Sequence, residues 1–199
     1  MRNVVKALWW LAKLPIRLVF RLAFGGWAER RGRRAELRMK RKLEARGIPV
    51  IHDLFVRHGN GVWTQIDLVA FLGDRIAVVE VKNYGGTVEV APDRAEWAVT
   101  YAGGRRATMR SPLRQNAQHC KALRERFGRP GVAFENHVAF DRTPLRGGCE
   151  GVWDRVPELW PTDETQAARA VWNAIVAHDE ATDRMAASRE HMRWIKGQR

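Results

Sequence analysis

Residues 64–86 read TQIDLVAFLGDRIAVVEVKNYGG and predict the centre of the fold. Two apolar runs, 63–72 and 75–82, are separated by Gly73-Asp74, a dipeptide typical of a short hairpin loop. With a two-residue loop, the numbers of facing residues sum to 147, as those of Gly73 and Asp74 do. A four-residue loop keeps this register, whereas an odd loop length would break it.

This register brings four polar residues to one side of the hairpin. Asp67 faces Glu80 and Gln65 faces Lys82, and because side chains alternate, all four project to the same face. Facing residues have Cβ atoms roughly 5 Å apart, so the two carboxylates would repel each other among apolar neighbours. A divalent cation between them removes this repulsion, and hard oxygen ligands favour Mg²⁺ or Mn²⁺ over zinc.

These residue types suit the hydrolysis of a phosphodiester. Asp67 and Glu80 would hold the ion, which polarises the scissile phosphate and lowers the pKa of a bound water. Lys82 would orient and activate that water and stabilise the charge that develops on the phosphate. The alternative is a structural Glu–Lys pair on a solvated strand edge, since a Glu-x-Lys tripeptide is common by chance. The register match with Asp67 favours the metal site.

Around the hairpin, turn residues and apolar periodicity predict further strands and helices. The additional strands are expected at 50–57, 87–90, 97–101, 105–109 and 132–140. Ser111 is the expected N-cap of a helix that begins at Pro112 and ends before Gly128. A last helix is expected to begin at Thr162, with Thr162 as its cap, and to reach Trp194 with a break on the way.

The N-terminal quarter carries most of the net charge of +13. Residues 1–47 hold 14 Lys or Arg against 3 Asp or Glu, which predicts a surface for nucleic acid or an anionic membrane. Residues 1–26 combine a broad apolar surface with a narrow basic stripe, as in helices that lie in a membrane interface. Their charge-free run is too short to span a bilayer. Packing of the same apolar faces on the domain is the alternative.

Gly25-Gly26 predict a break before a second basic helix, 28–46. In that helix Glu36 shares the apolar stripe of Met39 and Leu43, because these positions recur at helical spacing. An acidic residue on an inward face needs a partner or a function. A pair with Lys40 on a solvated face is the simpler alternative.

Taken in order, these motifs resemble the nuclease-related domain (NERD) family, a branch of the restriction-endonuclease-like superfamily with its PD-(D/E)xK site. The resemblance covers about half of the chain, roughly from Arg34 to Phe127. The matching residues are Glu36, Gln65-Ile66-Asp67, Glu80-Val81-Lys82-Asn83-Tyr84, Gly86, Trp97, Pro112, Gln115 and Asn116.

The resemblance implies an α/β core, with a central mixed sheet flanked by helices and the catalytic carboxylates on a central hairpin. It also implies that Glu36 reaches the site from the preceding helix, and that Gln65 and Gln115 support it. The expected catalytic residues are Asp67, Glu80, Lys82, Glu36 and Gln65, and the expected metal-binding residues are Asp67, Glu80 and Val81. The expected organisation is an amphipathic helix over 1–26, a nuclease domain over 28–160 and a helical segment over 161–199.

The sequence thus predicts a Mg²⁺- or Mn²⁺-dependent nuclease that acts on DNA with little sequence specificity. The expected phosphate contacts come from the second basic helix, namely Arg33, Arg34, Arg38, Lys40, Arg41 and Lys42. A non-catalytic scaffold that binds a membrane or DNA with the same fold is the alternative. The expected location is the cytoplasm, with attachment to the inner face of the membrane through residues 1–26 as a variant. The six histidines lack ligand spacing, so zinc is not expected.

Overall fold

The computed structural model describes residues 16–197. Helix α2 (Ile16–Glu44) runs without interruption through Gly25-Gly26, so the expected break between two helices is wrong. A glycine inside a helix costs only about 1 kcal/mol, and the good helix formers on both sides outweigh that cost. The part of the expected 1–26 helix before Ile16 lies outside the described residues.

The chain divides after Arg34 into two units, and each is described by itself. The first contains the N-terminal part of α2. Among the described residues, no helix is both long enough and apolar enough to cross a membrane. Everything from Ala35 onward belongs to the second unit, which contains the predicted hairpin.

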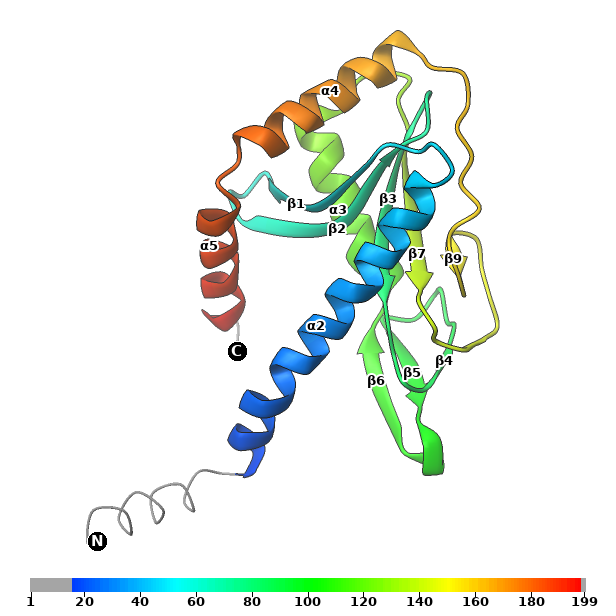
Figure 1. The fold of residues 1–199 in the computed structure, drawn as a ribbon, viewed down its shortest axis with the longest axis vertical. Coiled ribbons are helices and arrows are strands. Elements are labelled where there is room, and N and C mark those ends of the chain that lie inside the picture. Colours follow the sequence, from blue (N-terminus) through cyan, green and yellow to red (C-terminus); the bar gives the residue numbers. More distant parts are fainter. Residues whose placement is uncertain (1–15, 198–199) are drawn as a thin grey trace, which may run out of the picture. The chain divides into compact units, whose positions relative to one another are not determined.

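The second unit is built on a mixed five-stranded sheet with the order β1-β2-β3-β7-β9 (Figure 1). The first three strands are antiparallel, whereas β3, β7 and β9 run parallel. Their bounds are β1 (Val50–Arg57), β2 (Trp63–Phe71), β3 (Ile76–Lys82), β7 (Phe134–Phe140) and β9 (Val152–Trp153). With helices on this sheet, the predicted α/β fold class is confirmed.

A second, smaller sheet has the order β6-β5-β4-β8. Its strands are β4 (Thr87–Glu89), β5 (Glu96–Thr100), β6 (Arg106–Arg110) and β8 (Leu145–Arg146), with a 3₁₀ turn, η1 (Ala102–Gly104), between β5 and β6. The buried side chains of Trp97 and Val99 pack there against Phe140 of β7. The small sheet therefore packs against the C-terminal end of β7, the strand that lies next to β3 in the large sheet.

Helices cover both faces of the large sheet because each strand alternates two apolar sets. Leu68, Ala77 and Val79 pack on one face against Met39 and Leu43 of α2. The other face packs against α3 (Pro112–Phe127) and α4 (Gln166–Ala181). The last helix, α5 (Arg184–Gly197), follows α4 and contacts β1 and β2. The central hairpin is thus buried from both sides.

The predicted register of the hairpin is confirmed where β2 and β3 are paired. The pairs run from Leu68↔Val79 to Phe71↔Ile76, and the loop is four residues long. Pairing stops at Leu68↔Val79, so neither the expected Asp67–Glu80 pair nor the expected Gln65–Lys82 pair is formed. Asp53 of β1, with φ 62°, interrupts the neighbouring β1–β2 ladder at the same level, and beyond it β2 stays paired with β1 alone.

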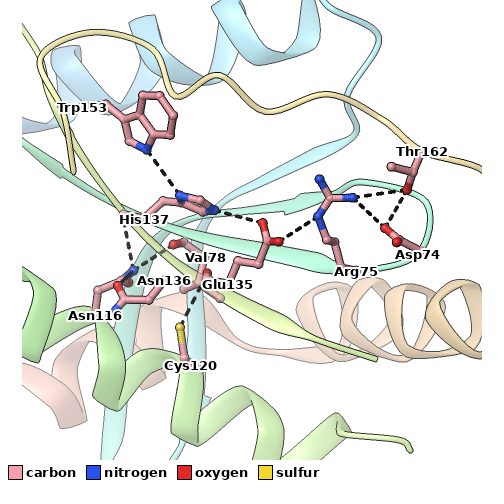
Figure 2. A network of polar contacts seen from close by, with 10 residues as sticks. All are labelled: Asp74, Arg75, Val78, Asn116, Cys120, Glu135, Asn136, His137, Trp153 and Thr162. Atoms are coloured by element: carbon pink, nitrogen blue, oxygen red, sulfur yellow. Dashed lines mark hydrogen bonds and ion pairs between the residues drawn. The ribbon is translucent and has the colours of Figure 1, made fainter. Parts of the chain in front are cut away.

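Helix α3 begins and ends as predicted. The Ser111 side chain accepts a hydrogen bond from the Arg114 N–H at 3.3 Å, and Gly128 is the C-cap. Asn116 then fixes the helix to the sheet: its Nδ2 lies 2.8 Å from Val78 O and 2.8 Å from Asn136 Oδ1 (Figure 2). These two bonds hold α3 against β3 and β7.

Polar contacts connect Trp153 of β9 with His137 and Glu135 of β7 and with Arg75 of the hairpin loop (Figure 2). Trp153 Nε1 donates to His137 Nδ1 at 3.3 Å, so the ring proton lies on Nε2, 3.0 Å from Glu135 Oε2. Glu135 also pairs with Arg75 at 2.8 Å.

Thr162 is not the helix cap that its position suggests. Its hydroxyl lies 2.8 Å from Leu72 O and 2.6 Å from Asp74 Oδ1 in the hairpin loop, and it donates to one of these acceptors at a time. The cap is Thr165, which accepts from the Ala168 N–H at 3.2 Å. Thr162 could not be told from a cap because its partners are distant in sequence.

Candidate metal and nucleic-acid site

Asp67 and Glu80 lie where the β2–β3 pairing ends. Asp67 is partly accessible, and its Oδ2 accepts a hydrogen bond from the Val81 N–H at 2.8 Å. That side-chain contact continues the connection between the strands beyond Leu68↔Val79. Glu80 has a side chain only 3% exposed, and Lys82 Nζ lies 2.5 Å from its Oε1. Asp67, Glu80 and Lys82 therefore form one cluster, although Asp67 and Glu80 are not a ladder pair.

Burial and the neighbouring negative charges disfavour the ionised form of Asp67. Burial raises the pKa of Asp67 well above its ordinary value, and the negative charges of Glu80 and Glu36 raise it further. Burial alone would lower the pKa of Lys82, but Glu80 and Asp67 outweigh burial and raise it. Lys82 is therefore a cation at neutral pH, suited to stabilising negative charge rather than to accepting a proton.

A divalent cation fits the oxygen atoms of this cluster. Among the described residues Glu80 Oε2 is buried without a hydrogen-bond partner, and burial and the neighbouring negative charges disfavour the charged form of Asp67 and so raise its pKa. The described residues include no group of three or more His, Cys, Asp or Glu side chains that could hold a metal. An ion here would rely on two carboxylates, the Val81 backbone carbonyl and water, which suits Mg²⁺ because it keeps several waters.

The two predicted glutamines have different positions. Gln115 of α3 accepts a hydrogen bond from Lys82 Nζ at 3.1 Å, so it supports the cluster as the resemblance implies. Gln65 instead donates to Asp53 Oδ1 at 2.5 Å and is paired with Phe55. Gln65 is therefore bonded to β1 rather than to Lys82.

Glu36 lies near the cluster but is bonded to a histidine. Its Oε2 is 2.9 Å from His52 Nε2, and its charge is one of those that raise the pKa of Asp67. The expected inward position is consistent with these contacts, and the alternative pair with Lys40 is not formed, because Lys40 pairs with Glu44 at 3.0 Å.

His119 was not singled out from the sequence. Its side chain is 7% exposed, and its Nδ1 lies 3.4 Å from Glu80 Oε2; neither atom has a hydrogen-bond partner in the part of the chain that the structure describes. Burial lowers the pKa of His119, although Glu80 opposes this effect. Its spacing of four residues from Gln115 on one helix face is the only sequence signal that points to the site.

The basic residues of α2 do not form a uniform phosphate-binding surface. Arg38 Nη2 lies 2.5 Å from Asp141 Oδ2, and the Asp141 side chain is only 5% exposed. Arg38 is therefore paired within the fold, and its expected contact with phosphate stays a prediction. Arg41 and Lys42 are exposed, as are Arg33 and Arg34 in the first unit.

Replacing Arg38 is expected to affect stability, and replacing Arg41 is not. Arg38→Met leaves a buried carboxylate unpaired, so we expect the free energy of unfolding to fall by about 2–4 kcal/mol. Arg41 is exposed, so the free energy of unfolding of Arg41→Met should lie within about 0.5 kcal/mol of that of the parent. Urea unfolding of the two variants decides the matter; equal stability would mean that the Arg38–Asp141 pair is not part of the folded protein in solution.

A cleft of about 1110 Å³ opens beside the cluster. This volume exceeds the roughly 300–1,000 Å³ of typical small-molecule pockets. Asp67, Gln115 and His119 line it, so it gives access to the candidate metal site. The other lining residues come from the β1–β2 turn, β2, the small sheet, α3 and α5, and include His58, Trp63, Arg110, Arg114, His191 and Trp194.

Comparison with known proteins adds the following. The family model described as nuclease-related domain matches residues 28–141. An uncharacterized protein of Bacillus anthracis is 28% identical over 110 residues, which are 55% of this chain and 51% of that protein. The chain thus spans about half the length of this curated relative. No solved structure matches the chain.

Proposed function

Because the chain belongs to the nuclease-related domain family, we propose that it is a metal-dependent nuclease that hydrolyses phosphodiester bonds in DNA. The observation that carries the proposal is the buried Glu80 carboxylate: its Oε1 pairs with Lys82, its charge acts on Asp67, and its Oε2 has no hydrogen-bond partner among the described residues. A buried carboxylate oxygen without a partner is costly for a fold unless a cation binds it.

Each residue of the cluster has a role in this proposal. Asp67, Glu80 and the Val81 carbonyl would hold Mg²⁺ or Mn²⁺, and the ion, when bound, would polarise the scissile phosphate and lower the pKa of a bound water. Lys82 stays protonated and orients the attacking water while stabilising negative charge on the phosphate. Gln115 accepts a hydrogen bond from Lys82 and so holds its ammonium group in place.

Recognition of DNA in this proposal is largely independent of base sequence. Exposed cations such as Arg41 and Lys42 suit contacts with phosphates, which fix the position of DNA without reading bases. Affinity should accordingly fall as the salt concentration rises.

Cleavage assays with the full chain test the proposal. Supercoiled plasmid and single-stranded DNA are incubated with Mg²⁺, Mn²⁺ or EDTA, and products are resolved by electrophoresis. We expect cleavage with either metal and none in EDTA. Cleavage that persists in EDTA, or DNA binding without cleavage under any metal, would replace this proposal with a metal-independent enzyme or a non-catalytic DNA-binding protein.

We also propose that residues 1–26 attach the nuclease to an anionic membrane surface. The support is the sequence pattern alone, in which a basic stripe borders a broad apolar surface with paired tryptophans. Flotation with vesicles that contain phosphatidylserine should recover the full chain, and a chain that lacks residues 1–26 should stay unbound. Equal flotation of both would contradict membrane attachment.

A further inference from the structure

Helix α5 supplies part of the cleft although it lies outside the family match. The match ends at residue 141, whereas His191, Trp194 and Ile195 of α5 line the cleft together with Asp67. The catalytic cluster and this helix therefore border the same space. Any substrate that reaches Asp67 through the cleft passes beside side chains that the family match does not include.

Polar contacts hold α5 in this position. Trp63 Nε1 donates to Glu190 Oε2 at 2.8 Å, and His191 Nδ1 lies 2.7 Å from Trp63 O. Arg57 also donates to Glu190 at 3.1 Å, and Ala187 is buried against the rest of the unit. These contacts leave the helix fixed to β1 and β2, so its cleft-lining side chains keep a defined position.

Trp194 combines a cleft-lining position with unusual exposure. Its side chain is 46% exposed, although a large aromatic residue is normally buried further. Arg110 of β6 and Arg114 of α3 line the same cleft, and the Arg114 guanidinium is held by Asp93 O at 2.8 Å. The cleft therefore offers an aromatic face and two cations beside the candidate metal site.

We propose that Trp194 is a stacking platform for an unpaired base and that the cleft takes single-stranded DNA in preference to duplex. The inference rests on the proposed function, since it assigns a substrate class to the same site. An indole can stack only on a base whose face is free, and in a duplex both faces are already stacked. Phosphate contacts from Arg110 and Arg114 complete the pattern of aromatic and cationic side chains that binds single strands.

The test measures binding separately from cleavage. The full chain, Trp194→Ala and Trp194→Phe are titrated in EDTA with a fluorescein-labelled thymidine oligonucleotide and with a duplex of the same length. Trp160→Ala is the matched control, because Trp160 is 61% exposed and does not line the cleft. Thermal unfolding of each variant checks whether the substitution has changed the stability of the fold.

We expect Trp194→Ala to weaken single-strand binding by about 5- to 150-fold, the range that the stacking of one base supplies. Duplex binding should change less than twofold, Trp194→Phe should restore most of the affinity, and Trp160→Ala should match the parent. Unchanged single-strand affinity for Trp194→Ala, an equal loss for both forms of DNA, or no binding by the parent would each overturn the inference.

The outcomes separate this inference from the proposed function. Single-strand binding that depends on Trp194, without cleavage in any metal, would leave the inference standing and remove the catalytic proposal. Metal-dependent cleavage with no effect of Trp194→Ala on binding would do the reverse.

Discussion

Glu80→Gln is expected to lower metal-dependent DNA cleavage by about 10³-fold. A bound metal supplies several kcal/mol of transition-state stabilisation, and about 1.4 kcal/mol corresponds to a factor of ten in rate. Gln has the same shape as Glu, but it removes the charge that an ion needs at a side chain only 3% exposed. The measurement is the initial rate of plasmid cleavage at saturating Mg²⁺.

The fold should survive this substitution. Glu80→Gln weakens the pair with Lys82 but also removes a charge that raises the pKa of Asp67, so the two changes in stability oppose each other. Glu44→Gln is the matched control, because Glu44 is exposed and pairs with Lys40 on the same helix. A Glu80→Gln variant that cleaves within tenfold of the parent would show that the metal site has been assigned wrongly.

Lys82 should differ from Asp67 and Glu80 in a way that titration with Mg²⁺ reveals. Asp67→Asn, like Glu80→Gln, should raise the Mg²⁺ concentration needed for half-maximal cleavage, because both remove a proposed metal ligand. Lys82→Met should lower the maximal rate without raising that concentration, because Lys82 acts on the water and the phosphate.

Gly73→Ala is expected to lower the free energy of unfolding by about 4 kcal/mol. Gly73 has φ 97°, a backbone conformation that costs other residues about 1–3 kcal/mol. A Cβ atom at Gly73 would also lie 2.2 Å from the backbone oxygen of Thr162, and relieving such a clash costs a further 1–3 kcal/mol or so. Urea unfolding of the variant measures the sum.

Gly61→Ala separates the cost of the positive φ angle from the cost of the clash with Thr162. Gly61 lies in the β1–β2 turn with φ 82°, but a Cβ atom there would meet no heavy atom within 4 Å. Its substitution should therefore cost only the conformational part, about 1–3 kcal/mol. If Gly73→Ala proved no more damaging than Gly61→Ala, the segment around Thr162 would not be packed on the hairpin loop as described.

Local sequence chemistry determined the hairpin and much of the site. Gly73-Asp74 and the alternating apolar runs define a register that the paired part of β2 and β3 confirms. Ser111, Pro112 and Gly128 define α3 because a cap and a stop act on backbone groups only a few residues away. These signals can be read from the chain because turn type and side-chain alternation depend on neighbours in sequence.

Contacts between distant residues were decided by the tertiary structure alone. Arg38 looked like its neighbours in a basic helix until Asp141, far along the chain, proved to be its partner. His119 meets Glu80, and Trp194 reaches the cleft of Asp67, only because α3 and α5 pack on particular strands. A sequence pattern records which face of an element is apolar, but not which element covers it. The partners of a charged or aromatic side chain are therefore fixed only when the elements pack.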